Sequence, residues 1–228
     1  MTKYTTLLFD ADGTLLDFQS AEKQALKNTF EKYQIPLTPQ LKERYEVINS
    51  DLWKQFELGI IDKKTVVYTR FVKLFQEFEI NADGIAFEDD YQSALGRGHE
   101  LLPHAYEVIE NLSQNYQLYI VTNGVSKTQY SRMKECGLES YFKDIFVSED
   151  TGYQKPAKEY FDYCFQRIEN LDLKKTLIIG DSLSSDIQGG INVGIDTCWY
   201  NPQHLENTKQ LPITYTISDL RELYMILK

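Results

Sequence analysis

Short apolar segments alternate with segments of helical periodicity along most of this chain, and this alternation limits the folds open to it. The predicted strands are residues 5–9, 118–122, 144–148, 176–180, 195–199 and 213–217, and the predicted helices lie near 104–114, 126–136, 157–169, 185–192 and at the chain end. Strands joined through helices favour a mainly parallel sheet with helices on both faces. The predicted fold class is therefore α/β, with a doubly wound, mainly parallel sheet.

One long segment, from about residue 20 to about residue 95, interrupts the alternation with charged and aromatic sequence. Its apolar side chains recur at helical spacing, Thr38 before Pro39 is typical of a helix start, and Asp62 is a second candidate N-cap. The stretch GRGHELLP at 96–103 has the glycines and proline of a hinge. We predict an all-helical insert of four helices. The predicted domains are a core of residues 1–16 and 99–228 and a cap of residues 17–98.

The composition excludes several classes of protein. Hydrophobic residues make up 42% of the 228 positions, which suits a globular chain and not a disordered one. A net charge of −10 disfavours binding to a nucleic acid polymer, and three separated cysteines offer neither a disulfide framework nor a zinc site. No apolar run is long enough for a membrane helix and no signal region is present, so we expect a cytoplasmic protein with no membrane partner.

Polar side chains follow the predicted strands at the points where the strands end. They are Asp10 and Asp12, Thr122 and Asn123, Lys155, and Asp181 with Asp186. The carboxyl ends of parallel strands meet at one edge of a sheet, which is where open α/β sheets bind ligands. We therefore expect these residues to form one site.

A site with several carboxylates requires a cation. Two like charges about 4 Å apart repel by roughly 4 kcal/mol at an effective dielectric near 20. Lys155 supplies one positive charge, and an oxygen-rich site without histidine or cysteine favours Mg²⁺. With Mg²⁺ as cofactor the site can accept a phosphate, whose oxygens Thr122 and Lys155 can hold. Asn123 is a further candidate for phosphate binding, with loop support as the alternative.

The spacing of the two N-terminal aspartates suits phosphoryl transfer. Asp10 is the predicted nucleophile, which forms an aspartyl-phosphate. Asp12 is the predicted acid that protonates the leaving alcohol and later takes a proton from water. Asp181 is expected to bind Mg²⁺ directly, and Asp186 to act through water or on the first ligands, although it could also cap the helix that follows.

Four motifs in this order resemble the haloacid dehalogenase (HAD) superfamily. They are FDADGT, VTN, the lysine of QKP, and IIGDSLSSD, and the helical insert resembles the family's C1 cap. The resemblance implies a HAD-like core and the same catalytic and metal roles for the residues named above. It also implies that the main-chain carbonyl of Asp12 ligates Mg²⁺, so the expected metal site comprises Asp10, Asp12, Asp181 and Asp186.

Two further stretches narrow the resemblance. SEDTGYQKPAKEYFDYCF and GDSLSSDIQGGINVGIDTCWYNP are similar to the branch of pyrimidine 5'-nucleotidases, which implies a small phosphorylated metabolite, a pyrimidine nucleoside monophosphate, as substrate. Trp53 lies off the apolar stripe that runs from Leu41 to Phe56, and we hypothesise that it stacks on the base.

Other functions stay open at this point. A phosphatase or mutase for sugar phosphates would share all four motifs. A dehalogenase would need no acid at Asp12, because halide leaves without a proton. A phospho-accepting signalling module also places acids and a lysine at strand ends, but such modules are about half this length and lack the helical insert.

Overall fold

The computed structural model describes residues 3–228, which divide into two units. The core unit takes the chain up to Phe18 and again from His99, and the helical unit is Gln19–Gly98. The first division lies beyond the predicted one, because the backbone N–H of Asp17 donates to the Glu100 carbonyl (2.9 Å) and holds this residue with the core. No helix in the described part of the chain is both long and apolar enough to cross a membrane.

A six-stranded parallel sheet organises the described residues of the core unit. Its strand order is β3-β2-β1-β4-β5-β6. The strands are β1 (Thr6–Phe9), β2 (Gln117–Thr122), β3 (Asp144–Val147), β4 (Thr176–Gly180), β5 (Asp196–Tyr200) and β6 (Tyr215–Ile217). This is the order of a doubly wound sheet, and it confirms the predicted fold class. Because β1 pairs with both β2 and β4, the carboxyl ends of these three strands lie side by side.

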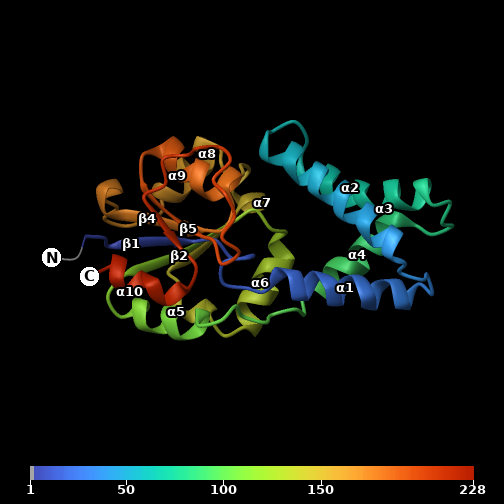
Figure 1. Cartoon of the computed structure of the whole chain (residues 1–228), viewed down its shortest axis with the longest axis horizontal. Helices are drawn as coiled ribbons and strands as arrows, with labels where there is room; N and C mark the ends of the chain where they lie inside the picture. Colours follow the sequence, from blue (N-terminus) through green and yellow to red (C-terminus); the bar gives the residue numbers. More distant parts are fainter. Residues whose placement is uncertain (1–2) are drawn as a thin grey trace. The chain divides into compact units, whose positions relative to one another are not determined.

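Helices cover both faces of this sheet, as Figure 1 shows with α8 and α9 on one side and α5 and α10 on the other. The core helices are α5 (Ala105–Ser113), α6 (Ser126–Glu135), α7 (Ser148–Thr151), α8 (Lys158–Phe165), α9 (Gln188–Val193) and α10 (Leu223–Ile226). Leu7 and Phe9 of β1 share a buried cluster with Val108 of α5, whereas Leu8 shares one with Phe161 of α8. A strand buried on both faces therefore appears in the sequence as an uninterrupted apolar run.

Two predicted helices differ from the structure in this unit. The helix predicted over 157–169 ends at Phe165. The helix predicted over 185–192 is a wide turn, Leu183–Ile187, followed by α9. The turn forms because the N–H groups of Asp186 and Ile187 both donate to the Ser182 carbonyl, at 3.1 Å each.

Four helices build the helical unit, as predicted. They are α1 (Phe18–Lys32, its first residue in the core unit), α2 (Pro39–Glu57), α3 (Lys63–Glu77) and α4 (Gly84–Leu95). The predicted caps are confirmed, since the Thr38 hydroxyl accepts from the Leu41 N–H (3.2 Å) and Asp62 from the Thr65 N–H (2.8 Å).

Aromatic rings make the centre of the helical unit. The Phe87 ring lies 4.9 Å from that of Phe30 and 4.6 Å from that of Phe71. Phe78, which continues the apolar stripe of α3 in the sequence, is exposed because α3 ends at Glu77. The apolar residues of α3 before it, Val67, Phe71, Leu74 and Phe75, are buried, and the unit has its own core.

Candidate active site

The site begins where β1 ends, at Asp10. The Asp10 N–H donates to the Ile179 carbonyl (2.9 Å), so this residue continues the ladder at the centre of the sheet. The chain then turns at Gly13, whose φ of +81° favours glycine. A Cβ at Gly13 would lie 2.4 Å from Oδ2 of Asp181, so the turn also needs glycine for space. The sequence DADG thus brings β1 against the loop after β4.

Three carboxylates meet at this point. Oxygens of Asp10, Asp181 and Asp186 lie within 4.8 Å of one another. Asp10 and Asp186 are buried, whereas Asp181 stays open to solvent. Gly180 makes room for the cluster, because a Cβ there would lie 2.3 Å from Cγ of Asp186. The wide turn after Ser182 therefore points Asp186 inward, which supports a role in the cluster beyond capping a helix.

Lys155 is the buried cation of the cluster. Its ammonium donates to Asp10 Oδ1 (2.7 Å), to Asp186 Oδ1 (2.6 Å) and to the Val121 carbonyl (2.6 Å). Burial disfavours the charged lysine, but the carboxylates of Asp10 and Asp186 outweigh it and raise the pKa of Lys155 above its ordinary value. An ammonium has three donors, and all three are used here.

One ammonium does not balance three carboxylates. Burial raises the pKa of Asp10, and Asp186 and Asp181 raise it further although Lys155 opposes them. Partial desolvation by the surrounding protein atoms and the charge of Asp186 also raise the pKa of Asp181, although its side chain remains accessible to solvent. The excess of two negative charges, the purely oxygen donor set and the solvent-open Asp181 fit a Mg²⁺ ion held by these three acids.

The end of β2 lies beside this cluster. The Thr122 hydroxyl accepts from the Gly124 N–H (3.1 Å) and from the Gln129 side chain (2.8 Å). The Asn123 amide donates to the Lys155 carbonyl and accepts from the Lys155 N–H, each at 2.9 Å. Asn123 therefore holds the loop that carries Lys155, and phosphate contacts by Thr122, Asn123 and Lys155 stay predictions.

The Asp12 side chain lies outside the cluster. Its Oδ1 accepts from the Arg132 guanidinium and its Oδ2 from the Gln129 amide (2.7 Å). The sequence interpretation did not include Gln129 or Arg132. One signal could have indicated them, because α6 starts three residues after the motif VTN and residues three apart share a helix face.

Trp53 is in the helical unit and is half-buried. Its ring packs edge-on against Phe56, 5.6 Å between centroids, and the Lys63 ammonium lies 6.0 Å from its centre. This agrees with its position off the stripe of α2. A contact with a nucleotide base stays a prediction.

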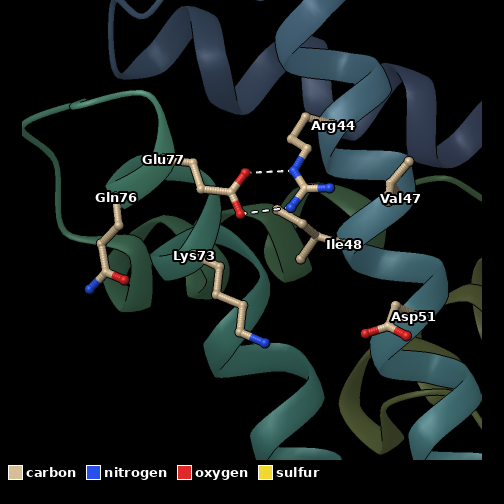
Figure 2. Close-up of a pocket in the computed structure, with 7 residues that line it drawn as sticks. All are labelled: Arg44, Val47, Ile48, Asp51, Lys73, Gln76 and Glu77. Atoms are coloured by element: carbon tan, nitrogen blue, oxygen red, sulfur yellow. Dashed lines mark hydrogen bonds and ion pairs between the residues drawn. The ribbon is translucent and has the colours of Figure 1, made fainter.

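The helical unit also carries a groove of about 480 Å³ between α2 and α3 (Figure 2). Arg44 and Glu77 form a two-bond ion pair across it, at 2.5 and 2.8 Å. Lys73 and Asp51 lie on its sides. The groove has one neutralised pair and no convergent carboxylates, so it offers none of the chemistry seen around Asp10.

Comparison with known proteins agrees with this geometry. The family model described as haloacid dehalogenase-like hydrolase matches residues 7–200. The chain belongs to the haloacid dehalogenase-like hydrolases. YfnB of Bacillus subtilis (strain 168), named as a HAD-hydrolase, is 52% identical over 100% of this chain and 97% of its own length. A crystal structure of YfnB bound to magnesium, described as revealing interdomain movement, superposes with a TM-score of 0.94 over 99% of both chains.

Two further HAD relatives are named as pyrimidine 5'-nucleotidases. PynA of Streptococcus pneumoniae is 41% identical over 96% of this chain and 93% of its own. YjjG of Escherichia coli (strain K12) is 32% identical over 99% and 98%. The predicted family is thus confirmed, and the acidic cluster together with the magnesium-bound relative confirms the predicted cofactor.

Proposed function

We propose that this HAD-like hydrolase is a Mg²⁺-dependent phosphatase that works through an aspartyl-phosphate on Asp10. The observation that carries the proposal is that Asp10 and Asp12 have different surroundings. Asp10 lies in the three-carboxylate cluster with Lys155 on one of its oxygens, whereas Asp12, two residues on, stands apart. Among residues 3–228, Oδ2 of Asp10 receives only a 3.5 Å contact from the Thr14 hydroxyl, which supports this oxygen as the nucleophile.

The reaction has two displacements at phosphorus. In the first, an Asp10 oxygen bonds to phosphorus while the bond to the leaving oxygen breaks, and Asp12 gives that oxygen a proton. In the second, water attacks the phosphoryl group, the bond to Asp10 breaks, and Asp12 takes the proton from the water. The products are the alcohol and inorganic phosphate. When bound, Mg²⁺ offsets the negative charge of the carboxylates and the phosphoryl group.

We propose pyrimidine nucleoside 5'-monophosphates as the substrate class. The support is that PynA and YjjG, both named as pyrimidine 5'-nucleotidases, align with nearly the whole chain, helical unit included. In this proposal the helical unit acts as the family's cap and Trp53 stacks on the base. Fold and core site alone do not choose a leaving group. A cytoplasmic location stays a prediction.

The test is kcat/KM for purified enzyme with Mg²⁺ over a panel of nucleotides and sugar phosphates. Uridine, cytidine and thymidine monophosphates are expected to give the highest values. A sugar phosphate at the top of the panel would overturn the substrate class but not the phosphatase. Product that appears only with a sugar bisphosphate present would indicate a mutase.

Trp53→Ala tests the base contact separately. The variant is expected to lower kcat/KM for uridine monophosphate relative to ribose 5-phosphate by about tenfold, the value of one stacked base. Phe78→Ala, which removes an exposed aromatic ring of the same unit, is the matched control. An unchanged ratio in the Trp53 variant would exclude stacking by this residue.

A further inference from the structure

Helix α6 sends two buried side chains to the loop that carries Asp12. Arg132 and Gln129 are 0% and 1% exposed, and each donates to a different oxygen of the Asp12 carboxylate. A carboxylate only accepts, so the Gln129 amide presents its nitrogen to it. The Asp12 side chain itself is 26% exposed. The partly exposed Asp12 carboxylate is thus held by two side chains, Arg132 and Gln129, that solvent does not reach.

Gln129 also connects Asp12 to the end of β2. The Gln129 amide nitrogen donates both to Asp12 (2.7 Å) and to the Thr122 hydroxyl (2.8 Å), while its oxygen accepts from Arg132 (3.4 Å). Gly124 leaves the space for this side chain, because a Cβ there would lie 2.5 Å from Cγ of Gln129. The contact is therefore built into the backbone of the loop before α6.

These contacts separate the Asp12 carboxylate from the three other acids nearby. Asp12 is only two residues from Asp10, yet its carboxylate is absent from the cluster of Asp10, Asp181 and Asp186. A carboxylate free to rotate beside a site that favours a divalent cation would tend to become one more ligand. Arg132 neutralises Asp12 locally, and the two-point contact fixes its direction. A guanidinium used only as a buried structural group would not need to end on an acid that is partly open to solvent.

We propose that Arg132 and Gln129 are positioning residues that keep the Asp12 carboxylate out of the metal-binding cluster and available for proton transfer. This inference rests on the proposed phosphatase function. It does not assign either residue to contact with the substrate. It predicts that removal of Arg132 or Gln129 changes the kinetics in the same way as removal of Asp12 itself.

The leaving group separates this role from a merely structural one. An alkyl ester such as uridine monophosphate needs a proton on its leaving oxygen, whereas the phenolate of p-nitrophenyl phosphate leaves with little assistance. Because kcat/KM reports the first displacement and not the later hydrolysis of the aspartyl-phosphate, Arg132→Met is expected to lower kcat/KM for uridine monophosphate by about 100-fold, the low end of general acid–base effects. It should lower kcat/KM for p-nitrophenyl phosphate by no more than about tenfold. Arg132→Lys should recover part of the loss, since it restores charge without the planar fork.

A double variant tests whether Arg132 acts through Asp12. If it does, adding Arg132→Met to Asp12→Ala lowers kcat for uridine monophosphate by no more than about twofold beyond Asp12→Ala alone. Independent action would instead multiply the two losses and overturn the proposal. Lys134→Met, which removes an exposed charge from the same helix, is the matched control and is expected to match the wild type.

Magnesium binding supplies a readout other than turnover. Calorimetric titration of Mg²⁺ is expected to show affinity in Arg132→Met equal to or tighter than in the wild type, because Asp12 becomes free to join the cluster. Loss of binding would contradict the proposal. If circular dichroism shows that Arg132→Met does not fold, Gln129→Met replaces it in the test. This variant is expected to show the same dependence on the leaving group.

The outcomes also separate this inference from the proposed function. If the wild type hydrolyses no phosphate ester of the panel, the phosphatase proposal fails, and if Asp10→Asn retains full turnover, Asp10 is not the nucleophile. If Asp12→Ala discriminates between the two leaving groups in kcat/KM but the Arg132 and Gln129 variants lower kcat/KM equally for both esters, only the positioning role fails.

Discussion

Each unit of this molecule buries a charged cluster, and the two clusters differ in balance. In the helical unit, Arg70 donates to both oxygens of Glu88 at 2.8 and 2.6 Å, and both side chains are almost fully buried. In the core unit, Lys155 lies between Asp10 and Asp186 at 2.7 and 2.6 Å. Burial and hydrogen-bond lengths are thus nearly the same in the two places.

The difference lies in what remains after pairing. Arg70 also donates to Asn49 (2.9 Å) and Glu88 also accepts from Gln92 (2.8 Å), so the pair in the helical unit is neutral and surrounded by partners. The core cluster retains a negative excess and an acid open to solvent, Asp181. Burial of charge by itself therefore does not mark a functional site. An excess of buried negative charge that an added cation can neutralise marks a functional site more specifically.

The largest effect is expected when the unbalanced cluster loses its nucleophile. Asp10→Asn keeps the size of the side chain and should lower phosphatase turnover on the order of 10⁴ to 10⁶-fold, as for other single nucleophiles. Thermal unfolding should show an intact fold, because the substitution removes negative charge from a crowded site. Substantial turnover by pure, Mg²⁺-saturated variant would show that Asp10 is not the nucleophile.

The balanced cluster should affect stability instead. Arg70→Met leaves Glu88 buried without its partner and is expected to lower the free energy of unfolding by about 3–5 kcal/mol. Urea unfolding followed by circular dichroism measures it. Adding Glu88→Leu removes the orphaned charge and should restore most of the loss. A single variant as stable as the wild type would mean that Arg70 and Glu88 are not paired as described.

The smallest effect is expected at the edge of the same network, at Glu22. This half-buried acid accepts from the hydroxyl of Tyr45 (3.1 Å) and the amide of Asn49 (3.4 Å), and burial raises its pKa above the ordinary 4.5. Because the folded pKa is the higher one, the stability that this group provides is present at low pH and is lost as pH rises through that pKa.

Glu22→Gln should therefore gain stability relative to the wild type as pH rises from about 4.5 to about 8. Urea unfolding at the two pH values measures the gain, with Glu43→Gln, an exposed acid of α2, as the control. A difference that is constant with pH would show that Glu22 does not titrate differently in the folded chain.

The sequence predicted the parts of the site that depend on strand ends. Asp10, Asp181 and Lys155 come together because parallel strands β1 and β4, and the loop between α7 and α8, deliver them to one edge of the sheet. Such positions follow from periodicity and topology alone. Helical spacing of apolar residues and N-cap residue types likewise predicted the four helices of the insert and the caps at Thr38 and Asp62.

Pairings between side chains of different helices, or between a helix and a distant loop, were not predictable in this way. Arg132 contacts a residue 120 positions away, and Arg70 and Glu88 lie on different helices. The spacing along α6 indicates only that Gln129 and Arg132 share a helix face, and since a charged residue in a helical segment is usually solvated, spacing does not separate a buried face from an exposed one. The direction in which Asp12 points depends on α6, and only the folded chain shows it.

The most direct test of the account is to trap the phosphoryl group on the core cluster. In Asp12→Ala, p-nitrophenyl phosphate should still phosphorylate the enzyme, while the second displacement slows because no base accepts the proton of water. Quenching this reaction with borohydride and sequencing the peptides by mass spectrometry is expected to show reduction of Asp10 alone, and only when Mg²⁺ is present. Release of p-nitrophenol with no reduced aspartate, or with reduction at another residue, would contradict the account.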